Sequence, residues 1–184
     1  MSQLKIGRPE ATEYTGYNPG YVSAVTGDDI ISILQQQLDG MVTLLRGLSE
    51  EQGNYRYEAG KWSIKELLGH VIDTERVFAY RALSFARNDR AALPGFDQDP
   101  WAKHANHANV AMRDLVDEFE SVRRSTIHLF RNLDSEAWMR QGLANNKPAT
   151  VRAQAYVIAG HTQHHLEILK SRYISVSQPT FRSE

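Results

Sequence analysis

Two histidines, His161 and His165, stand four residues apart near the C-terminal end of the sequence. At about 100° per residue along a helix, side chains four residues apart differ in direction by only about 40°. Both imidazoles therefore leave the same helix face about one turn apart, as two ligands of one metal ion would. His164 lies about 100° from His165, which makes it the weaker candidate of that neighbouring pair.

A third histidine, His70, lies on the flank of another apolar stripe, beside Leu67, Thr74 and Val77. Two histidines from one helix and one from another can converge on a metal in a bundle core. Three neutral imidazoles suit zinc, nickel or another divalent ion, and they leave a coordination position open to water. The alternative is a set of hydrogen-bonded core histidines, because spacing does not show which helices are neighbours. A metal held this way should bind more weakly as the pH falls through about 6.5.

Glu75 occupies the middle of an otherwise apolar stripe. Its carboxylate could pair with an arginine, orient a histidine ligand from the outer shell, or bind the metal directly. As a site residue, Glu75 is assigned to the outer shell. Spacing alone leaves the ion pair with an arginine open as the structural alternative.

Four segments have apolar residues in alternating steps of three and four, which is the pattern of amphipathic helices. The stripes run over residues 31–48, 64–85, 115–133 and 151–173. No segment alternates convincingly with period two, so a sheet is not expected. An all-α four-helix bundle is the natural way to bury four such stripes.

Sequence signals at the helix starts support these segments. Ser63 is followed three residues later by Glu66, as in a capping box, and Thr150 is a plausible cap for the last helix. Gly69 and Gly160 each precede a candidate ligand and interrupt a helix at a cost of about 1 kcal/mol. Their spacing gives no role for them.

Roughly twenty residues around LPGFDQDPW (93–101) join the second and third helices. At about 3.3 Å per residue such a segment can run back along a helix of about 25 residues, so a crossover with these helices parallel is allowed. Long loops are often functional, and Trp101 is a candidate wall of a substrate pocket. The chain divides into an extended lead-in (1–27), the bundle (28–174) and a flexible tail (175–184).

Charge and composition exclude several classes of protein. The 184 residues include 21 Lys and Arg and 22 Asp and Glu, a net charge of −1, which argues against a general nucleic-acid binder. The absence of cysteine rules out disulfides, a zinc ribbon and a cysteine nucleophile. With neither a signal-peptide pattern nor a run of about 18 apolar residues, we expect a cytoplasmic protein without membrane spans.

Other polar residues are interpreted as surface. His104 and His107 have a ligand-like spacing, but they lie in or near a loop without a third partner. His128 is interpreted as a helix-flank side chain. Arg123 and Arg124 form a basic pair of the kind normally found on a solvated helix face.

Three motifs resemble those of the DinB-like (YfiT-like) metalloenzyme family. The sequence WSIKELLGHVIDTE (62–75) resembles the signature W-S-x-x-E-x-x-x-H-x-x-D-x-E. The segment at 93–101 looks like the loop that often follows it, and AGHTQHH (159–165) is similar to the H-x-x-x-H of the last helix. The resemblance covers roughly residues 25–174 in order.

The resemblance implies a four-helix bundle with a divalent metal held by three histidines, which correspond to His70, His161 and His165. It also implies a homodimer, because family members often pair. Some members catalyse thiol chemistry with bacillithiol or mycothiol, including S-transfer and maleylpyruvate isomerisation, and many have no known reaction.

Three functions follow as expectations from this resemblance. The first is metal-dependent thiol S-transfer on a small-molecule substrate; since the chain has no cysteine, the thiol must be a low-molecular-weight cofactor. The second is metal-dependent hydrolysis. The third, from a different class, is a non-catalytic module for metal binding or dimerisation.

Overall fold

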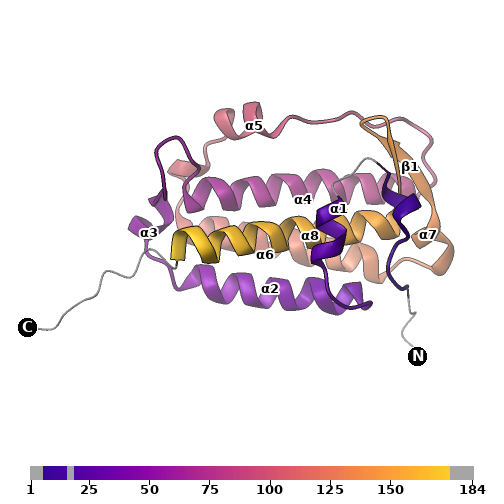
Figure 1. The fold of residues 1–184 in the computed structure, drawn as a ribbon, viewed down its shortest axis with the longest axis horizontal. Helices are drawn as coiled ribbons and strands as arrows, with labels where there is room; N and C mark the ends of the chain where they lie inside the picture. Colours follow the sequence, from indigo (N-terminus) through magenta and orange to yellow (C-terminus); the bar gives the residue numbers. More distant parts are fainter. Residues whose placement is uncertain (1–5, 16–18, 175–184) are drawn as a thin grey trace, which may run out of the picture.

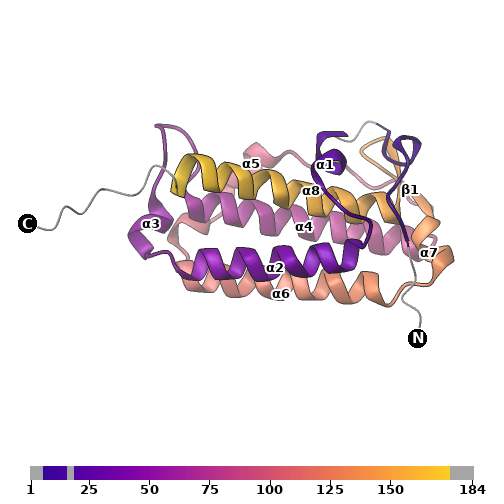
Figure 2. The ribbon, with the colours of Figure 1, turned by 60° about the horizontal axis from the view of Figure 1, so that its bottom comes forward.

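Four long helices carry the four apolar stripes of the sequence. In the computed structural model, which describes residues 6–15 and 19–174, they lie side by side in a bundle (Figures 1 and 2). They are α2 (Ile30–Arg46), α4 (Ile64–Ala86), α6 (Met112–Arg131) and α8 (Val151–Ile168). Helix α4 packs against α8 and α6, and α2 packs against the same two helices. The predicted four-helix bundle is confirmed.

The helix starts follow the predicted caps. The Ser63 hydroxyl accepts a hydrogen bond from the Glu66 backbone N–H, and the Glu66 carboxylate accepts one from the Ser63 N–H. Thr150 caps α8 by accepting from the Ala153 N–H. These contacts satisfy backbone donors that the first turn of a helix leaves without partners. They fix the first turns of the two helices that carry the candidate ligands.

A long crossover connects α4 to α6. Both helices begin at the α3 end of the bundle and end near α7, so they run parallel (Figure 1). The chain returns along the bundle through a segment that contains α5 (Gln98–His104) and the 3₁₀ turn η2 (His107–Asn109). The crossover that the loop length allowed is the observed topology.

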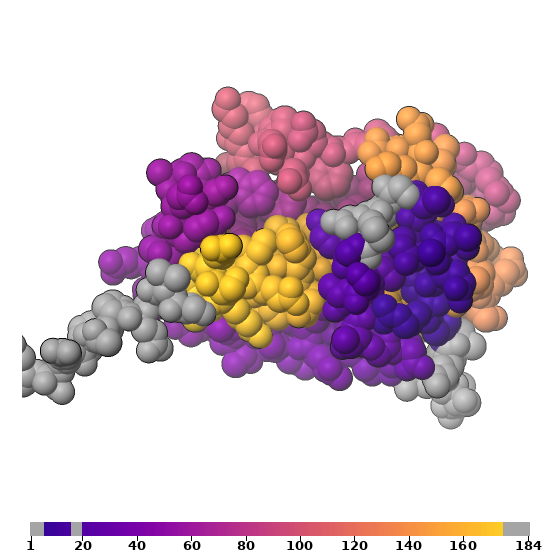
Figure 3. Space-filling view, in the orientation of Figure 1, coloured from indigo at the N-terminus to yellow at the C-terminus, as the bar shows by residue number. Residues whose placement is uncertain are grey.

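The lead-in is not extended over its whole length. It contains the 3₁₀ turn η1 (Ala11–Tyr14) and the short helix α1 (Pro19–Ala24), and α1 packs closely on α8. At Gly160 an added Cβ would lie 1.9 Å from the Tyr21 carbonyl oxygen, so glycine lets the two backbones touch. Figure 3 shows the indigo lead-in covering part of α8. The tail predicted at 175–184 lies outside the described residues.

A small antiparallel hairpin was not expected from the sequence. Strands β1 (Gln141–Ala144) and β2 (Lys147–Thr150) are joined by Asn145 and Asn146, with φ values of 53° and 57°. Asparagine tolerates this left-handed region better than most residues, which suits a two-residue hairpin turn. Strands of four residues are too short to display a clear period of two, so the expectation of no sheet was wrong here.

Shorter elements complete the described chain. Helix α3 (Glu50–Asn54) follows α2, α7 (Ser135–Met139) follows α6, and the π-helical turn η3 (Leu169–Ile174) continues α8. In η3 the Tyr173 hydroxyl donates to the Trp62 carbonyl oxygen at 2.7 Å, which ties the end of α8 to the start of α4. Among the helices of the described residues, none combines the length and apolar character needed to span a bilayer.

Candidate metal site

The packing of α4 against α8 brings the three predicted ligands together. His70 Nε2 lies 3.0 Å from His161 Nε2, and His165 Nε2 lies 3.1 Å from the same atom. All three side chains are buried. The spacing of four residues places two rings on one face of α8, and the neighbouring helix supplies the third.

The three nitrogens fit a divalent metal ion. Ligand nitrogens about 2.0–2.1 Å from a tetrahedral zinc lie about 3.3 Å from one another, close to the observed distances. A neutral imidazole nitrogen carries either a proton or a lone pair. A single His161 Nε2 therefore cannot make a good hydrogen bond with both neighbours, whereas a shared cation would satisfy three lone pairs at once. His70, His161 and His165 would hold that cation.

Hydrogen bonding at the far side of the His70 ring supports the required tautomer. The Thr74 hydroxyl lies 3.4 Å from His70 Nδ1, one helical turn away on α4. If Nδ1 carries the proton and donates it to this hydroxyl, the lone pair is left on Nε2, toward the other two rings. His165 Nδ1 is buried and has no hydrogen-bond partner in the described part of the chain.

Burial keeps the three rings neutral. It lowers the pKa of His70 to about 4 and that of His165 to about 3. Burial and the nearby His165 and His70 rings hold the pKa of His161 well below its ordinary value of 6.5. Neutral imidazole is the form that binds metal, so the site is ready to bind at neutral pH. The expected loss of metal near pH 6.5 therefore moves to a lower pH.

Aromatic rings surround the histidine cluster. Tyr21 of α1 packs edge-on against His161 with centroids 5.5 Å apart, and Trp62 tilts over His70 at 4.8 Å. Phe78, two turns along α4 from His70, contacts the His161 ring at 6.2 Å. These rings exclude water from the nitrogens, and electrostatic interactions are stronger in such surroundings. Sequence spacing gave no indication of Tyr21, since the segment that carries it was expected to be extended.

Arg123 lies at the centre of the bundle, where it is fully buried. Its Nη2 donates to Glu75 Oε2 at 2.7 Å and to the Thr162 hydroxyl at 2.7 Å, and its Nη1 donates to Gln37 Oε1 at 3.1 Å. One guanidinium thus joins all four long helices. The interpretation of Arg123 as part of a solvated face was wrong, because the acceptors that hold it come from three other helices and cannot be seen in its own segment.

Glu75 is the ion-pair partner of this arginine. Its oxygens accept from Arg123 Nε at 2.8 and 3.0 Å as well as from Nη2. In the described residues its hydrogen bonds go to Arg123 and to no histidine, and the group of possible metal ligands consists of the three histidines alone. The assignment of Glu75 to the outer shell of the metal site is therefore corrected to the ion-pair alternative.

His107 was expected to be a solvated surface residue, and this expectation was wrong. Its side chain is 16% exposed and its ring lies on Gly69, where an added Cβ would be 2.1 Å from His107 Nδ1. Its Nε2 is 3.8 Å from Asp73 Oδ2. Because Gly69 has no side chain, the connection from α4 to α6 can pack directly on α4, one residue from the candidate ligand His70. His104, by contrast, is exposed as expected.

Two hollows have linings that include residues of α4. Trp101, half exposed, lines one of about 400 Å³ together with Pro94, Gly95 and Phe96, and its part in a substrate pocket stays a prediction. The second, of about 390 Å³, lies beside Trp62 and has a polar lining that includes Arg56, Lys61, Asp99 and Lys103.

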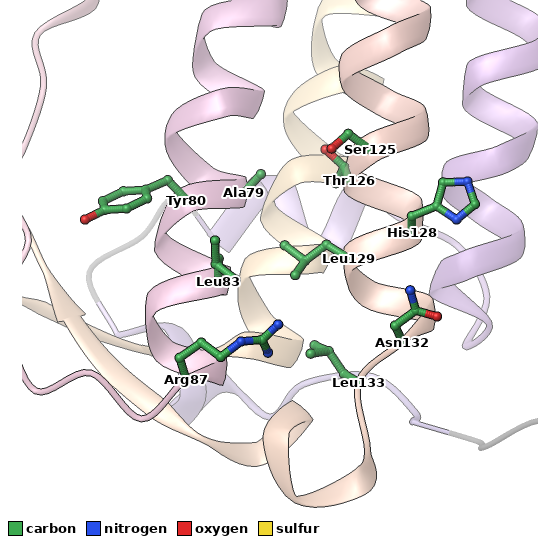
Figure 4. Close-up of a pocket in the computed structure, with 10 residues that line it drawn as sticks. All are labelled: Ala79, Tyr80, Leu83, Arg87, Ser125, Thr126, His128, Leu129, Asn132 and Leu133. Atoms are coloured by element: carbon green, nitrogen blue, oxygen red, sulfur yellow. The ribbon is translucent and has the colours of Figure 1, made fainter.

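A third hollow, of about 460 Å³, lies between α4 and α6 (Figure 4). Tyr80, Leu83 and Leu129 are among its apolar residues, and His128 lies at its edge (Figure 4). None of the three clustered histidines lines it. The same holds for the other two hollows, so the histidine cluster lines none of the three.

Comparison with known proteins identifies the class. The model of the DinB superfamily matches residues 33–169, so the chain belongs to this superfamily of four-helix-bundle proteins. In structure, the chain is similar to YfiT from Bacillus subtilis, with a TM-score of 0.69 over 88% of this chain and 97% of that one, at 14% sequence identity. YfiT is described as "a probable metal-dependent hydrolase with an unusual four-helix bundle topology". This likeness confirms the fold.

Two relatives carry related names. A protein of Oceanobacillus iheyensis is 26% identical over 152 residues, which cover 79% of this chain and 86% of the relative. A protein of Geobacillus thermodenitrificans is 22% identical over 139 residues, or 73% and 77% of the two chains. Both bear the name "Putative metal-dependent hydrolase".

Proposed function

We propose that this protein is a metal-dependent hydrolase of a small-molecule substrate, with His70, His161 and His165 as the metal ligands. The clustering of three buried histidines, with one ligand nitrogen of each within 4.8 Å of the others, is the observation that carries the proposal. The names of the two relatives and the description of YfiT agree with it. A divalent ion such as zinc or nickel, when bound, supplies Lewis acidity and lowers the pKa of water.

The chain's own residues prepare the site for an anionic nucleophile. Three neutral imidazoles leave the charge of a divalent ion uncompensated, which favours a negatively charged fourth partner. Tyr21, Trp62 and Phe78 keep bulk water from the ligand nitrogens. Arg123 holds Thr162, the residue next to His161, and so fixes the register of α8 at the site.

Thiol S-transfer is the second candidate. The same uncompensated charge would favour a thiolate, since a coordinating thiol loses its proton. The chain contains no cysteine, so the thiol would be a separate low-molecular-weight cofactor.

We also propose that the protein forms a homodimer, as the family resemblance implies. A cytoplasmic location stays a prediction.

One experiment separates the three functions. Protein loaded with zinc or nickel is assayed with a panel of activated esters and amides, and with electrophiles plus low-molecular-weight thiols. His161→Ala should lose activity, and His104→Ala, an exposed control, should keep it. Hydrolysis without added thiol supports the first candidate, and turnover only with thiol supports the second. Equal rates from wild type and His161→Ala would favour the non-catalytic module.

A further inference from the structure

The hollow beside Trp101 has the size and lining of a binding pocket for a small organic group. Its volume of about 400 Å³ lies within the range of ligand sites, about 300–1,000 Å³. Its walls come from one face of α4 and from the returning segment. The apolar part is formed by Val77, Leu93, Pro94, Phe96 and Trp101. Such a lining suits an aromatic or branched aliphatic group.

A continuous set of aromatic contacts connects this hollow to the histidine cluster. The Phe96 ring lies 5.1 Å from Trp101 on one side and 6.4 Å from Phe78 on the other. Phe78 in turn contacts His161 at 6.2 Å. Two rings, Phe96 and Phe78, therefore lie between the hollow and His161, and none of the three clustered histidines lines the hollow itself.

The charged residues of the lining favour an anion. Arg76, Arg81 and Asp73 line the hollow, and Asp73 and Glu118 together offset the charge of Arg76. Arg76 lies 3.7 Å from Asp73 and 2.7 Å from Glu118, at the exposed side. Arg81 is buried, and its guanidinium lies over the Phe78 and Phe96 rings at 5.3 and 5.8 Å. Its Nη2 donates to the Pro94 carbonyl oxygen at 3.1 Å, so this buried cation is held at the wall of the hollow, beyond Phe78 along α4 from His70.

We propose that this hollow binds the apolar part of the substrate, an aromatic or branched aliphatic group that carries a single negative charge, such as a carboxylate or sulfonate. The group would occupy the space between Val77 and Trp101, with its charge toward Arg81. That this ligand is the substrate rests on the proposed enzymatic function. The binding preference rests on the hollow alone.

The other hollows fit this ligand less well. The hollow beside Trp62 contains Lys61, Lys103 and Asp99 in a polar lining that offers little apolar surface. The groove between α4 and α6 has Ser125, Thr126 and Asn132 in its lining, and Phe96, the ring that contacts Phe78, does not line it. These differences define the controls of the experiment.

The test uses two fluorescent probes of similar shape, 8-anilinonaphthalene-1-sulfonate, which is an anion, and N-phenyl-1-naphthylamine, which is neutral. Wild-type protein should bind the anion at one site and at least about tenfold more tightly than the neutral probe. Val77→Phe fills the hollow and should weaken both probes about tenfold or more. Leu129→Phe makes the same kind of addition in the α4–α6 groove and should change neither.

The charge is tested separately. Arg81→Met should remove the preference for the anionic probe. Val77 is partly exposed, so Val77→Glu leaves the buried arginine in place, and it should weaken binding of the anionic probe more than binding of the neutral probe. Circular dichroism and melting temperature report folding; should Arg81→Met not fold, Val77→Glu decides.

Three results would overturn the proposal: no binding of either probe, equal affinity for both probes in wild type, or loss of binding in Leu129→Phe with Val77→Phe unaffected. The titrations are repeated with and without zinc. Because they need no turnover, an inactive protein that still shows the predicted probe pattern would contradict the hydrolase and leave the pocket standing.

Discussion

Arg123 of α6 and Glu75 of α4 form a bidentate ion pair in the middle of the bundle, with Nη2–Oε2 at 2.7 Å and Nε–Oε1 at 2.8 Å. The two side chains are 0% and 2% exposed, so neither charge can be solvated by water if its partner is lost. The Thr162 hydroxyl, the Gln37 amide oxygen and the Leu34 carbonyl oxygen accept the remaining donors. The pair thus satisfies two charges that the core could not hold separately.

Removing one partner should destabilise the protein strongly. Glu75→Ala is expected to lower the free energy of unfolding by about 3–5 kcal/mol, because it leaves a buried guanidinium without its counter-ion. Urea denaturation of the metal-free protein measures this. The double variant Glu75→Leu, Arg123→Met should lose less, since it removes both charges. A Glu75→Ala variant that kept its stability but lost its metal would instead restore the outer-shell assignment.

Metal content should depend on the three clustered histidines. His70→Ala, His161→Ala and His165→Ala should each lower the bound metal sharply, because two imidazoles alone make a weak site. His104→Ala should retain the wild-type amount, as should His128→Ala, whose side chain lies at the α4–α6 groove. Elemental analysis of the purified variants provides the measurement. Full retention of metal by the His165 variant would refute the assignment.

The stability of the metal-free protein should fall as the pH is lowered. Burial lowers the pKa of His70 to about 4 and that of His165 to about 3, whereas an unfolded histidine titrates near 6.5. Between these values the unfolded chain binds more protons, so stability is fully present above about pH 6.5 and declines below it. At pH 5 each of the two histidines should cost about 2 kcal/mol.

Chemical denaturation with chelator present, at pH 7 and pH 5, measures this loss. In the variant His165→Leu the unfolding free energy should fall by about 2 kcal/mol less between pH 7 and pH 5 than in the wild type, because the contribution of His165 is removed. An unchanged unfolding free energy between the two pH values would contradict the burial of neutral histidines.

The contact between Gly69 and His107 can be tested by a double-mutant cycle. Gly69→Ala places a Cβ 2.1 Å from His107 Nδ1, so the ring must move, and we expect a loss of about 1–3 kcal/mol. In a His107→Ala background the same change should be neutral or should gain up to about 1 kcal/mol, since alanine favours helix over glycine. Thermal unfolding of the four proteins gives the coupling energy. Equal effects of Gly69→Ala in both backgrounds would show that the contact does not exist.

The sequence predicts the bundle well because its signals are local. Period and capping are properties of neighbouring residues, and the Ser63 and Thr150 caps lie where the pattern placed them. The pair His161 and His165 also follows from helical spacing alone. The approach of His70 to them is a long-range contact. The sequence allows this contact but does not predict it, because spacing does not show which helices are neighbours.

Apart from the local hairpin, the features that the sequence missed depend on distant partners. Arg123 looks like a surface residue until Glu75 and Thr162 are placed beside it. Gly160 has no visible role without the Tyr21 backbone, and Gly69 has none without His107. A glycine next to a candidate ligand, inside a helix that it weakens, is nevertheless a signal that another segment approaches closely there.

The connection between α4 and α6 separates two demands that usually compete in a small protein, namely stable folding and a changeable binding surface. Its length is set by topology, because it must return along the bundle so that α4 and α6 can run parallel. Its residues contribute little to the buried core: α5 contains no buried residue, and Trp101 is half exposed. Substitutions there can reshape the hollow at small cost to folding, since surface connections tolerate change better than packed helices. The lining of the hollow can therefore change through this segment while the bundle and its three histidines stay the same.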